Sequence, residues 1–361
     1  MDIRETLSAR KTSSTNEEAD KRLLHVKDLS VAFSGRDGWV SAVTGVSFDI
    51  AKGESVALVG ESGCGKSVTA MSVLRLLDMS YAKVEAEELK FCGTDILSLS
   101  DRTMRSVRGN EISMIFQEPM TSLNPLFTVG FQIAESVRLH LGKSKRAAMQ
   151  YAVEMLDRVG ISDPKESVKS YPHQFSGGMR QRVMIAMAMA CNPKLLIADE
   201  PTTALDVTIQ AQILDLMREM RKTYDMSLLM ITHNLGVVAE IADRAMVMYA
   251  GQIVEETTAA ELFDAPMHPY TQGLVDSIPT MDLDAKRKLC VIKGTVPSPM
   301  FYSKACRFSP RCDRRRARCG EVAPQLDKVS DRHFVRCHFP FRAGVADDLD
   351  SAPVFRGEEI H

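Results

Sequence analysis

The chain has 361 residues, of which 45% are hydrophobic and 25% charged, as in an ordinary globular protein, and its net charge of −2 gives no overall attraction to nucleic acid. No apolar run approaches the ~20 residues of a membrane-spanning helix, and residues 1–21 lack the apolar core of a signal peptide. We therefore expect a cytosolic chain whose eight cysteines are thiols or metal ligands rather than disulfides, and whose membrane role, if it has one, depends on a partner.

The first part of the chain predicts a disordered leader followed by two strands. Residues 1–21 are polar, and structure is expected to begin near Leu23. Residues 24–33 alternate imperfectly and residues 39–50 continue the pattern, which indicates strands separated by a glycine turn. Phe33 lies where an aromatic ring can stack on a purine, although composition alone favours a core residue.

The most informative stretch begins with an apolar run at Val56 and continues into GESGCGKS, residues 60–67. A buried strand, a glycine-rich loop and a helix are the context that a phosphate-binding loop needs, and a turn that binds nothing is the weaker interpretation. The glycines let backbone N–H groups surround a phosphate, and the helix N-terminus adds positive charge. Lys66 can reach the terminal phosphates and the Ser67 hydroxyl can bind Mg²⁺. The residues expected at the nucleotide are Gly60, Glu61, Ser62, Gly63, Cys64, Gly65, Lys66, Ser67 and Val68.

The middle of the chain predicts a helical insert in an α/β domain. Between residues 77 and 112 the signals are weak, and only short strands and a loop are expected. Residues 112–116 predict a strand that delivers Gln117 to a strand-to-loop junction. From residue 129 to 172 the apolar spacing becomes helical, with Ser144 as a predicted N-cap.

A Ser176-Gly177-Gly178 turn then precedes a helix expected over residues 179–191. A helix N-terminus behind flexible glycines is a candidate phosphate contact, but such turns are common in loops and the signal alone is weak. The methionines of this helix are expected to fill a core.

Two buried strands end in polar residues that can act on a bound nucleotide. Ligands lie at the carboxyl ends of parallel strands, so Asp199 is placed to hold Mg²⁺ and Glu200 to orient or deprotonate a water. The alternative is that this pair begins a solvated loop. Residues 227–232 lead to His233, either an ordinary turn histidine or a contact of the γ-phosphate, and strands at 244–249 and 252–256 close the domain.

Together these motifs resemble the ATP-binding cassette (ABC) ATPases from Phe33 to about Glu256. The family's ordered set is present as the phosphate loop, Gln117, the signature Ser176-Gly177-Gly178, Asp199-Glu200, Ala204-Leu205-Asp206 and His233. Phe175 and Met179 depart from the usual Leu-Ser-Gly-Gly-Gln signature but leave its serine and glycines intact.

The resemblance implies an α/β fold, a P-loop ABC-ATPase core whose mixed sheet is flanked by helices. It also implies an antiparallel β subdomain and a helical subdomain at about residues 125–190 within a nucleotide-binding domain of residues 22–265. A small cysteine-rich C-terminal extension would occupy residues 266–345, and the acidic residues 346–361 would form a tail.

By the same resemblance, two cassettes pair head to tail around two ATP molecules, so a second cassette, either a paralogue or a copy, is required. Phe33 would then stack on adenine, and Glu200, Lys66 and His233 would be catalytic, as general base, phosphate ligand and γ-phosphate sensor. The remaining implied roles are Mg²⁺ binding by Ser67, Gln117 and Asp199, contact with the partner's ATP by Ser176, Gly177, Gly178 and Met179, and coupling across the dimer by Asp206.

The phosphate loop, residues 116–125 (FQEPMTSLNP) and residues 268–271 (HPYT) are similar to the oligopeptide, dipeptide and nickel importer ATPases, a resemblance that extends to about Phe341. It implies an ATP-hydrolysing subunit at the cytoplasmic face of the membrane. Its partners would be two permeases, a second ABC ATPase subunit and an extracytoplasmic solute-binding protein, without nucleic acid. Dipeptides or oligopeptides are the foremost expected solute, with nickel or glutathione-like compounds as alternatives. A soluble ABC ATPase that acts on nucleic acid or ribosomes is the rival from another class.

The C-terminal region concentrates half of the cysteines in the pattern Cys306-x5-Cys312-x6-Cys319-x17-Cys337. The spacing lacks the Cys-x2-Cys pair usual for structural zinc, and by itself leaves an iron–sulfur cluster, zinc and unligated thiols open. Some peptide-importer relatives carry a [4Fe–4S] cluster on four cysteines here, which makes the cluster the favoured expectation and zinc the alternative. The other cysteines, expected to be unligated, are Cys64, Cys92, Cys191 and Cys290.

Overall fold

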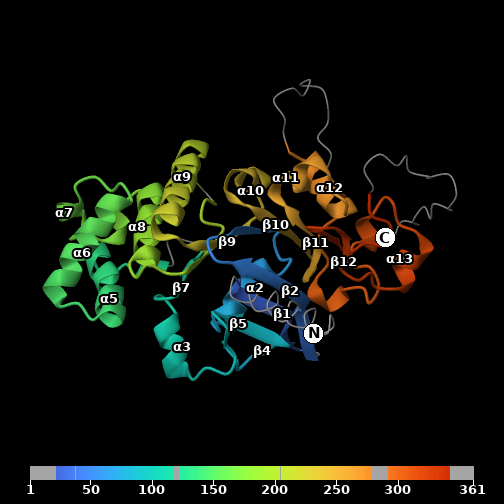
Figure 1. Cartoon of the computed structure of the whole chain (residues 1–361), viewed down its shortest axis with the longest axis horizontal. Coiled ribbons are helices and arrows are strands. Elements are labelled where there is room, and N and C mark those ends of the chain that lie inside the picture. The colour runs from blue at the N-terminus through green and yellow to red at the C-terminus, as the bar shows by residue number, and fades with distance from the viewer. Residues whose placement is uncertain (1–21, 37, 118–121, 204, 279–291, 342–361) are drawn as a thin grey trace, which may run out of the picture.

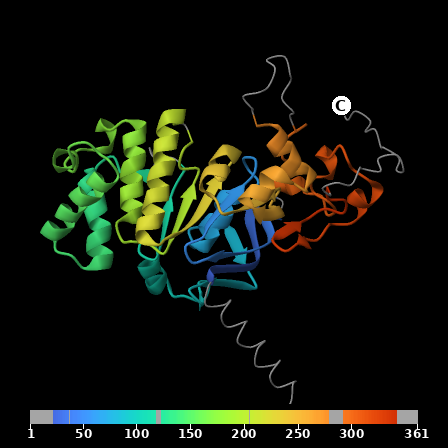
Figure 2. The same ribbon diagram turned by 45° about the horizontal axis from the view of Figure 1, so that its top comes forward.

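The computed structural model describes residues 22–36, 38–117, 122–203, 205–278 and 292–341. Two sheets occupy the middle of the molecule, with a helical part at one end and the C-terminal elements at the other (Figures 1 and 2). The predicted leader and the acidic tail lie outside the described residues. Among the described helices, none combines the length and the hydropathy needed to span a bilayer.

The larger sheet is mixed, as the ABC resemblance implies, and has the strand order β12-β13-β11-β10-β3-β9-β8-β7. The five strands from β10 to β7 are parallel, and the other three are antiparallel to their neighbours. Every residue of β3, β8 and β9 is buried, as expected for parallel strands covered on both faces. The strands are β3 (Ser55–Val59), β7 (Ile112–Ile115), β8 (Leu195–Asp199), β9 (Ser227–Thr232), β10 (Arg244–Tyr249), β11 (Gln252–Thr258), β12 (Asp327–Ser330) and β13 (His333–Val335).

The smaller sheet is antiparallel, with the order β2-β1-β5-β6 and with β4 paired to β1. Its two long strands confirm the strands predicted near the start of the chain. One hydrophobic core contains residues of this sheet, of β3 and of the first helix, α2 (Lys66–Val73), so the two sheets fold as one body. The strands are β1 (Arg22–Gly35), β2 (Gly38–Ala51), β4 (Ala82–Glu85), β5 (Glu88–Phe91) and β6 (Thr94–Asp95).

The stretch between residues 77 and 112 contains a helix, α3 (Asp101–Val107), that the sequence analysis did not predict. Ser100 caps it by accepting a hydrogen bond from the Thr103 N–H at 3.2 Å. Only Met104 and Val107 are buried on this helix, which is why its apolar periodicity was too short to indicate a helix.

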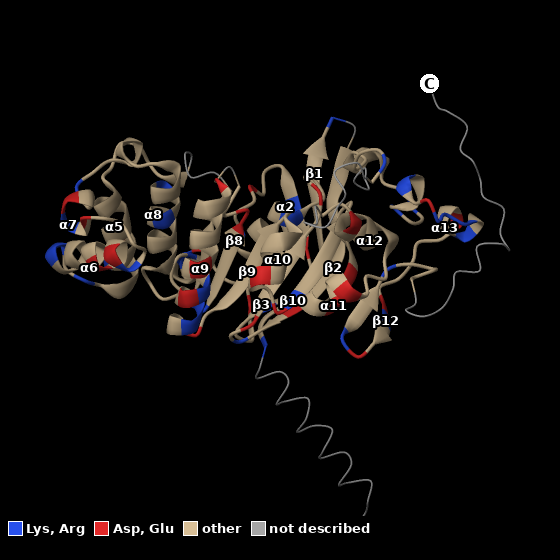
Figure 3. Ribbon diagram, turned by 90° about the horizontal axis from the view of Figure 1, so that it is seen from above, with Lys and Arg blue, Asp and Glu red and all other residues tan. Residues whose placement is uncertain are grey.

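The helical end of the molecule is built from α5 (Val129–Leu141), α6 (Lys145–Arg158), α7 (Pro164–Ser167) and α8 (Gly177–Met189), with a 3-10 turn η1 (Pro172–Gln174) before α8. Ser144 caps α6 as predicted. The helix expected from residue 179 instead begins at Gly177, because the Ser176 hydroxyl accepts the Met179 N–H. Acidic and basic residues are interspersed on the outer helices (Figure 3).

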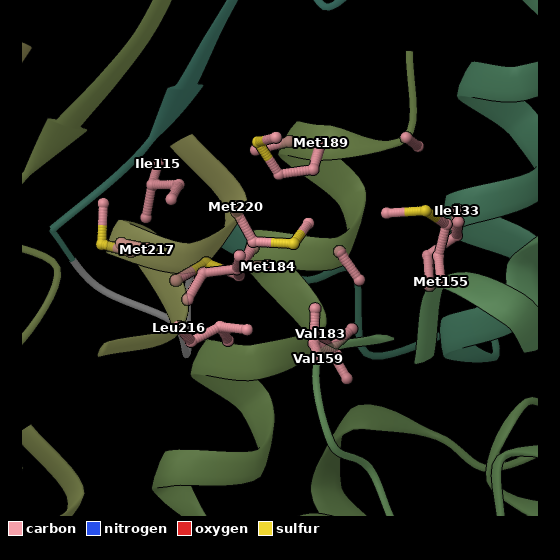
Figure 4. Close-up of a cluster of buried hydrophobic side chains, with 14 of the residues drawn as sticks. Ile115, Ile133, Met155, Val159, Val183, Met184, Met189, Leu216, Met217 and Met220 are labelled. Carbon is pink, nitrogen blue, oxygen red and sulfur yellow. The ribbon is translucent and has the colours of Figure 1, made fainter. Parts of the chain in front are cut away.

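A single core joins these helices to β7 and to α9 (Val207–Tyr224), which follows β8. Figure 4 shows methionines of α6, α8 and α9 among aliphatic side chains that include Ile133 of α5, Val183 of α8 and Leu216 of α9. Met184 and Met189 are buried there, which confirms that the methionines of α8 fill a core. The helical part is therefore attached to the sheet by continuous packing.

The remaining elements cover the sheet beside β10 and β11. Short helices alternate with loops, and β13 and β12 extend the sheet beyond β11. The elements are α10 (Leu235–Ile241), α11 (Ala259–Asp264), α12 (Pro269–Asp276), η2 (Pro299–Phe301), η3 (Ser309–Arg311) and α13 (Ala317–Glu321).

Candidate functional site

The phosphate loop connects the carboxyl end of β3 to α2 and is shaped by its glycines. A Cβ atom at Gly60 would lie 2.2 Å from the Met248 carbonyl oxygen, and Gly65 has a φ of 109°. The Lys66 side chain is buried, and its Nζ donates to the carbonyl oxygens of Gly60 at 2.7 Å and Glu61 at 2.9 Å. Lys66 thus holds the loop closed on its own backbone, at the end of the sheet where the other predicted residues lie.

Not all of the loop is open to solvent. Ser62 and Gly63 are exposed, whereas Cys64 is fully buried in the core between the sheets. Burial raises the pKa of the Cys64 thiol, so it is a neutral packing residue here. Val68 is half-buried against the same core.

Asp199 ends β8 and is only 4% exposed. Its Oδ1 has no hydrogen-bond partner among the described residues. Burial raises the pKa of Asp199, against the lowering effect of a hydrogen bond with Ser67 and of the Lys66 charge. A buried carboxylate oxygen without a partner, beside a serine hydroxyl, fits the oxygen ligands that Mg²⁺ prefers.

The Glu200 carboxylate is contacted by three side chains that follow the neighbouring strands β7, β8 and β9. Its carboxylate accepts hydrogen bonds from Gln117 Nε2 at 3.1 Å and Thr203 Oγ1 at 2.9 Å, and lies 3.2 Å from His233 Nδ1. Its φ of 47° is in the left-handed region, and its N–H donates to the Ile231 carbonyl at 2.9 Å, so the backbone is held in a sparsely populated conformation. Burial raises the pKa of Glu200, but the hydrogen bonds from His233 and Thr203 outweigh it and leave the pKa below its usual value. Glu200 is therefore an ionised acceptor at neutral pH.

The other predicted residues lie on separate elements. Ser176 and Gly177 are exposed at the start of α8, and Gly178 lies so close to Ile209 that a Cβ would approach its Cγ2 to 2.8 Å. The Met179 N–H is bound by the Ser176 hydroxyl, and Asp206 caps α9 by accepting the Ile209 N–H at 2.9 Å. The signature residues thus form the N-terminus of α8, where Ser176 and Gly177 are exposed and the local backbone is held by its own hydrogen bonds.

Phe33 lies near the end of β1 and is half-buried. Its ring stacks on Tyr81, with centroids 6.2 Å apart. The ring also packs against the core between the sheets.

Two family models match separate parts of the chain. The family model described as ABC transporter matches residues 43–203, and the model described as oligopeptide/dipeptide transporter, C-terminal region, matches residues 254–319. The dipeptide transport ATP-binding protein DppD of Bacillus subtilis (strain 168) is 52% identical over 317 residues, 88% of this chain and 94% of that protein. The chain belongs to the family of dipeptide and oligopeptide transport ATP-binding proteins. The oligopeptide transport ATP-binding protein OppD of the same organism is also 52% identical, over 87% of this chain and 88% of its own length.

Solved structures show the same cassette fold. A dimeric structure of MJ0796, titled a bacterial ABC transporter cassette, is 26% identical with a TM-score of 0.59, and covers 65% of this chain and 98% of its own. A dimeric post-hydrolysis state of the same cassette, bound to ADP and Pi, is 25% identical at the same TM-score and coverage. The chain is therefore an ABC ATPase in fold, with ATP and Mg²⁺ as the family's cofactors.

Three residues at this ABC site were missed by the sequence analysis. Thr203 reaches Glu200 from the loop after β8. Tyr270 Oη accepts the Glu61 N–H at 3.0 Å, and Arg311 Nη1 donates to both Glu61 carboxylate oxygens, at 3.0 and 3.2 Å. The last two lie more than 200 positions away from Glu61, and no local pattern in the sequence indicates such contacts.

The four C-terminal cysteines line one small cavity of about 20 Å³, together with His268. Burial raises the pKa of the Cys306 thiol, and it raises that of Cys312 to about 11 and that of Cys337 to about 12. Even so, no three Cys, His, Asp or Glu side chains in the described part of the chain are arranged to hold a metal ion. The expected gathering of thiols is present, but a ligand set is not. Among the other cysteines, Cys290 lies outside the described residues.

Proposed function

We propose that this chain is the ATP-hydrolysing subunit that energises import of dipeptides or oligopeptides, bound peripherally at the cytoplasmic face of a membrane. The observation that carries the chemistry is the convergence of Gln117, Thr203 and His233 on the Glu200 carboxylate, beside the phosphate loop. The peptide substrate is supported by relatives that are about half identical over most of the chain and are dipeptide or oligopeptide transport ATP-binding proteins.

In this proposal, ATP occupies the phosphate loop from Gly60 to Val68, with adenine against Phe33. Phosphate oxygens replace the carbonyls that Lys66 now contacts. Ser67, Gln117 and Asp199 hold Mg²⁺, which neutralises phosphate charge when bound. The unpartnered Oδ1 of Asp199 supports this role.

Glu200 is the general base, because it is an ionised carboxylate whose orientation is set by His233 and Thr203. It would accept a proton from a water aligned with the γ-phosphate. His233 senses the γ-phosphate, and its contact with Glu200 fixes the positions of the two side chains relative to each other. Most of the catalysis is then positioning and charge stabilisation, as in other phosphoryl transfers.

The working unit is a dimer of cassettes within a larger assembly. The exposed Ser176 and Gly177, with Gly178 and Met179, would contact the ATP of a second ABC ATPase subunit, and Asp206 would couple the two sites. Two permeases and an extracytoplasmic solute-binding protein complete the importer. The domain boundaries that accompany this proposal are a nucleotide-binding domain over residues 22–265 and a C-terminal domain over residues 266–345.

The C-terminal domain would carry a [4Fe–4S] cluster with a structural role, with zinc as the alternative. The support is the collection of Cys306, Cys312, Cys319 and Cys337 around one cavity. Iron and acid-labile sulfide are to be measured in anaerobically purified protein, with Cys312→Ser as the variant and the exposed Cys92→Ser as the control. A content below 0.1 iron per chain in the wild type (on the order of background) would reject the cluster, and stoichiometric zinc would select the alternative.

The experiment that tests the main proposal is purification of tagged Glu200→Gln from solubilised membranes with ATP, followed by mass spectrometry. We expect to recover two permeases and a second cassette subunit. The solute-binding protein of the same importer is then screened for binding of peptides, nickel and glutathione. Hydrolysis by the purified assembly should fall at least ~100-fold in Glu200→Gln while ATP stays bound, and Lys66→Ala should lose productive binding. The exposed Glu87→Gln is the matched control. Recovery with ribosomes or nucleic acid and without permeases would favour the soluble rival.

A further inference from the structure

Two side chains from the C-terminal part of the chain reach the second residue of the phosphate loop. The Glu61 N–H donates to Tyr270 Oη at 3.0 Å, and the Glu61 carboxylate receives Arg311 Nη1 on both oxygens. One loop residue is thus held through its backbone and through its side chain at once. Neither Tyr270 nor Arg311 lies in the region that the ABC transporter family model matches, which ends at residue 203.

Both holding groups are rigidly supported. Tyr270 is fully buried at the second position of α12, and its ring packs on Tyr249 with centroids 4.8 Å apart. The Arg311 side chain is 7% exposed, and its other N–H groups donate to the carbonyls of Lys293 at 2.8 Å and Gly294 at 3.1 Å. A guanidinium fixed on three sides keeps its geometry when the loop contact changes.

The Arg311 contact offsets the negative charge of Glu61 in the loop that is proposed to bind the nucleotide. A phosphate loop attracts a polyanion with backbone N–H groups and a lysine, and an unpaired carboxylate in the same loop opposes that attraction. Without Arg311, Glu61 would be such a carboxylate, and its side chain is 30% exposed. Arg311 Nη1 donates to both of its oxygens, which neutralises the carboxylate and restrains its direction.

We propose that Arg311 and Tyr270 are positioning residues for ATP: Arg311 neutralises and restrains Glu61, and Tyr270 fixes the Glu61 backbone, so that the phosphate loop is set for the triphosphate. The inference rests on the proposed function, since it assumes that this loop binds ATP. It makes nucleotide affinity depend on the C-terminal part of the chain. The alternative is that the two residues only brace the fold.

The test is titration of Mg²⁺–ATP into the full-length protein, with unfolding followed in parallel. Arg311→Gln should weaken ATP binding about tenfold, or about 1.4 kcal/mol, because Glu61 is left charged beside the phosphates. Adding Glu61→Gln should restore affinity to within about threefold of wild type, since the opposing charge is then gone. If Arg311 only stabilised the fold, adding Glu61→Gln would not restore ATP affinity. The defect of Arg311→Gln should also shrink at high salt, because repulsion between charges is screened.

Tyr270→Phe removes only the acceptor of the Glu61 N–H and provides a second variant that keeps the buried ring. It should raise the KM for ATP about threefold in the assembled transporter with kcat at saturating ATP retained. Arg332→Gln, an exposed arginine of the same C-terminal part, is the control. If Arg311→Gln and Tyr270→Phe bind ATP like wild type while Lys66→Ala does not, the inference is wrong and the proposed function stands. If the wild type binds no ATP, the proposed function fails.

Discussion

Glu255, in the middle of β11, connects the sheet to the segment that carries Tyr270, and its removal should have a large effect on stability. The residue is fully buried. Its carboxylate accepts hydrogen bonds from the backbone N–H groups of Met267 at 2.7 Å and His268 at 2.8 Å, and lies 2.6 Å from His333 Nε2. We consider the change Glu255→Ala, which deletes the acceptor for all three.

The expected loss of unfolding free energy follows from the buried groups that lose the Glu255 carboxylate as their partner. Breaking a buried charge pair by removing one partner costs ~3–5 kcal/mol, and each buried N–H left without an acceptor costs ~1–3 kcal/mol. Because α12 can shift and let water reach the freed groups, we expect a loss near the lower end of their sum, about 5 kcal/mol of unfolding free energy.

The pH dependence has a definite sign. Burial raises the pKa of Glu255, but the hydrogen bonds it accepts, that of His333 foremost, outweigh burial, so the folded pKa lies below the ordinary value of 4.5. A lowered carboxyl pKa means that its stabilisation is present above pH 4.5 and is lost as the pH falls through the folded pKa. The difference between wild type and Glu255→Ala should therefore be full at pH 7 and decrease below pH 4.5.

The assay is urea unfolding across pH, with hydrogen exchange measured by mass spectrometry over residues 259–278. The matched control is Glu87→Ala, an exposed glutamate whose ion pair with Lys27 lies at the surface and which should change stability by less than ~0.5 kcal/mol. A Glu255→Ala protein that unfolds at the wild-type urea concentration, with unchanged exchange in α12, would refute the reasoning.

Three further substitutions give separable results. Asp199→Asn should stabilise the nucleotide-free protein by about 1 kcal/mol in thermal unfolding, since burial raises the pKa of this carboxyl, yet abolish Mg²⁺-dependent hydrolysis; a lowered melting temperature would contradict this. Gly60→Ala should lose ATP binding by more than tenfold in titration, because its Cβ would lie 2.2 Å from the Met248 carbonyl oxygen, and near-normal affinity would show that the strand can yield. Ser176→Ala removes the cap on the Met179 N–H and should lower unfolding free energy by about 1 kcal/mol; turnover of the assembled transporter should fall with ATP binding at its own loop retained, and a parallel loss of both would argue against a role in trans.

The strand-end residues were predictable because their signals are local. An apolar run followed by Asp199-Glu200 identifies a buried strand and its carboxyl end, and the sheet order then brings Gln117 and His233 beside them. The contacts of Glu61 with Tyr270 and Arg311 were not predictable from the sequence, since they depend on how a distant segment packs. The cysteine spacing likewise predicted proximity but not ligand geometry, because side-chain direction is set by the surrounding fold.

The position of β3 in the sheet has a consequence for synthesis of the chain. β3 pairs with β9 and β10, whose partners in register, such as Ile231 and Met246 for Leu58, follow about half the chain later. The strand that leads into the phosphate loop therefore has no neighbour in its own sheet while the ribosome makes the first 226 residues. Because Arg311 is added later still, the contact that restrains Glu61 can form only after residue 311 has been made. A chain terminated before that point should bind nucleotide more weakly than the longer chain.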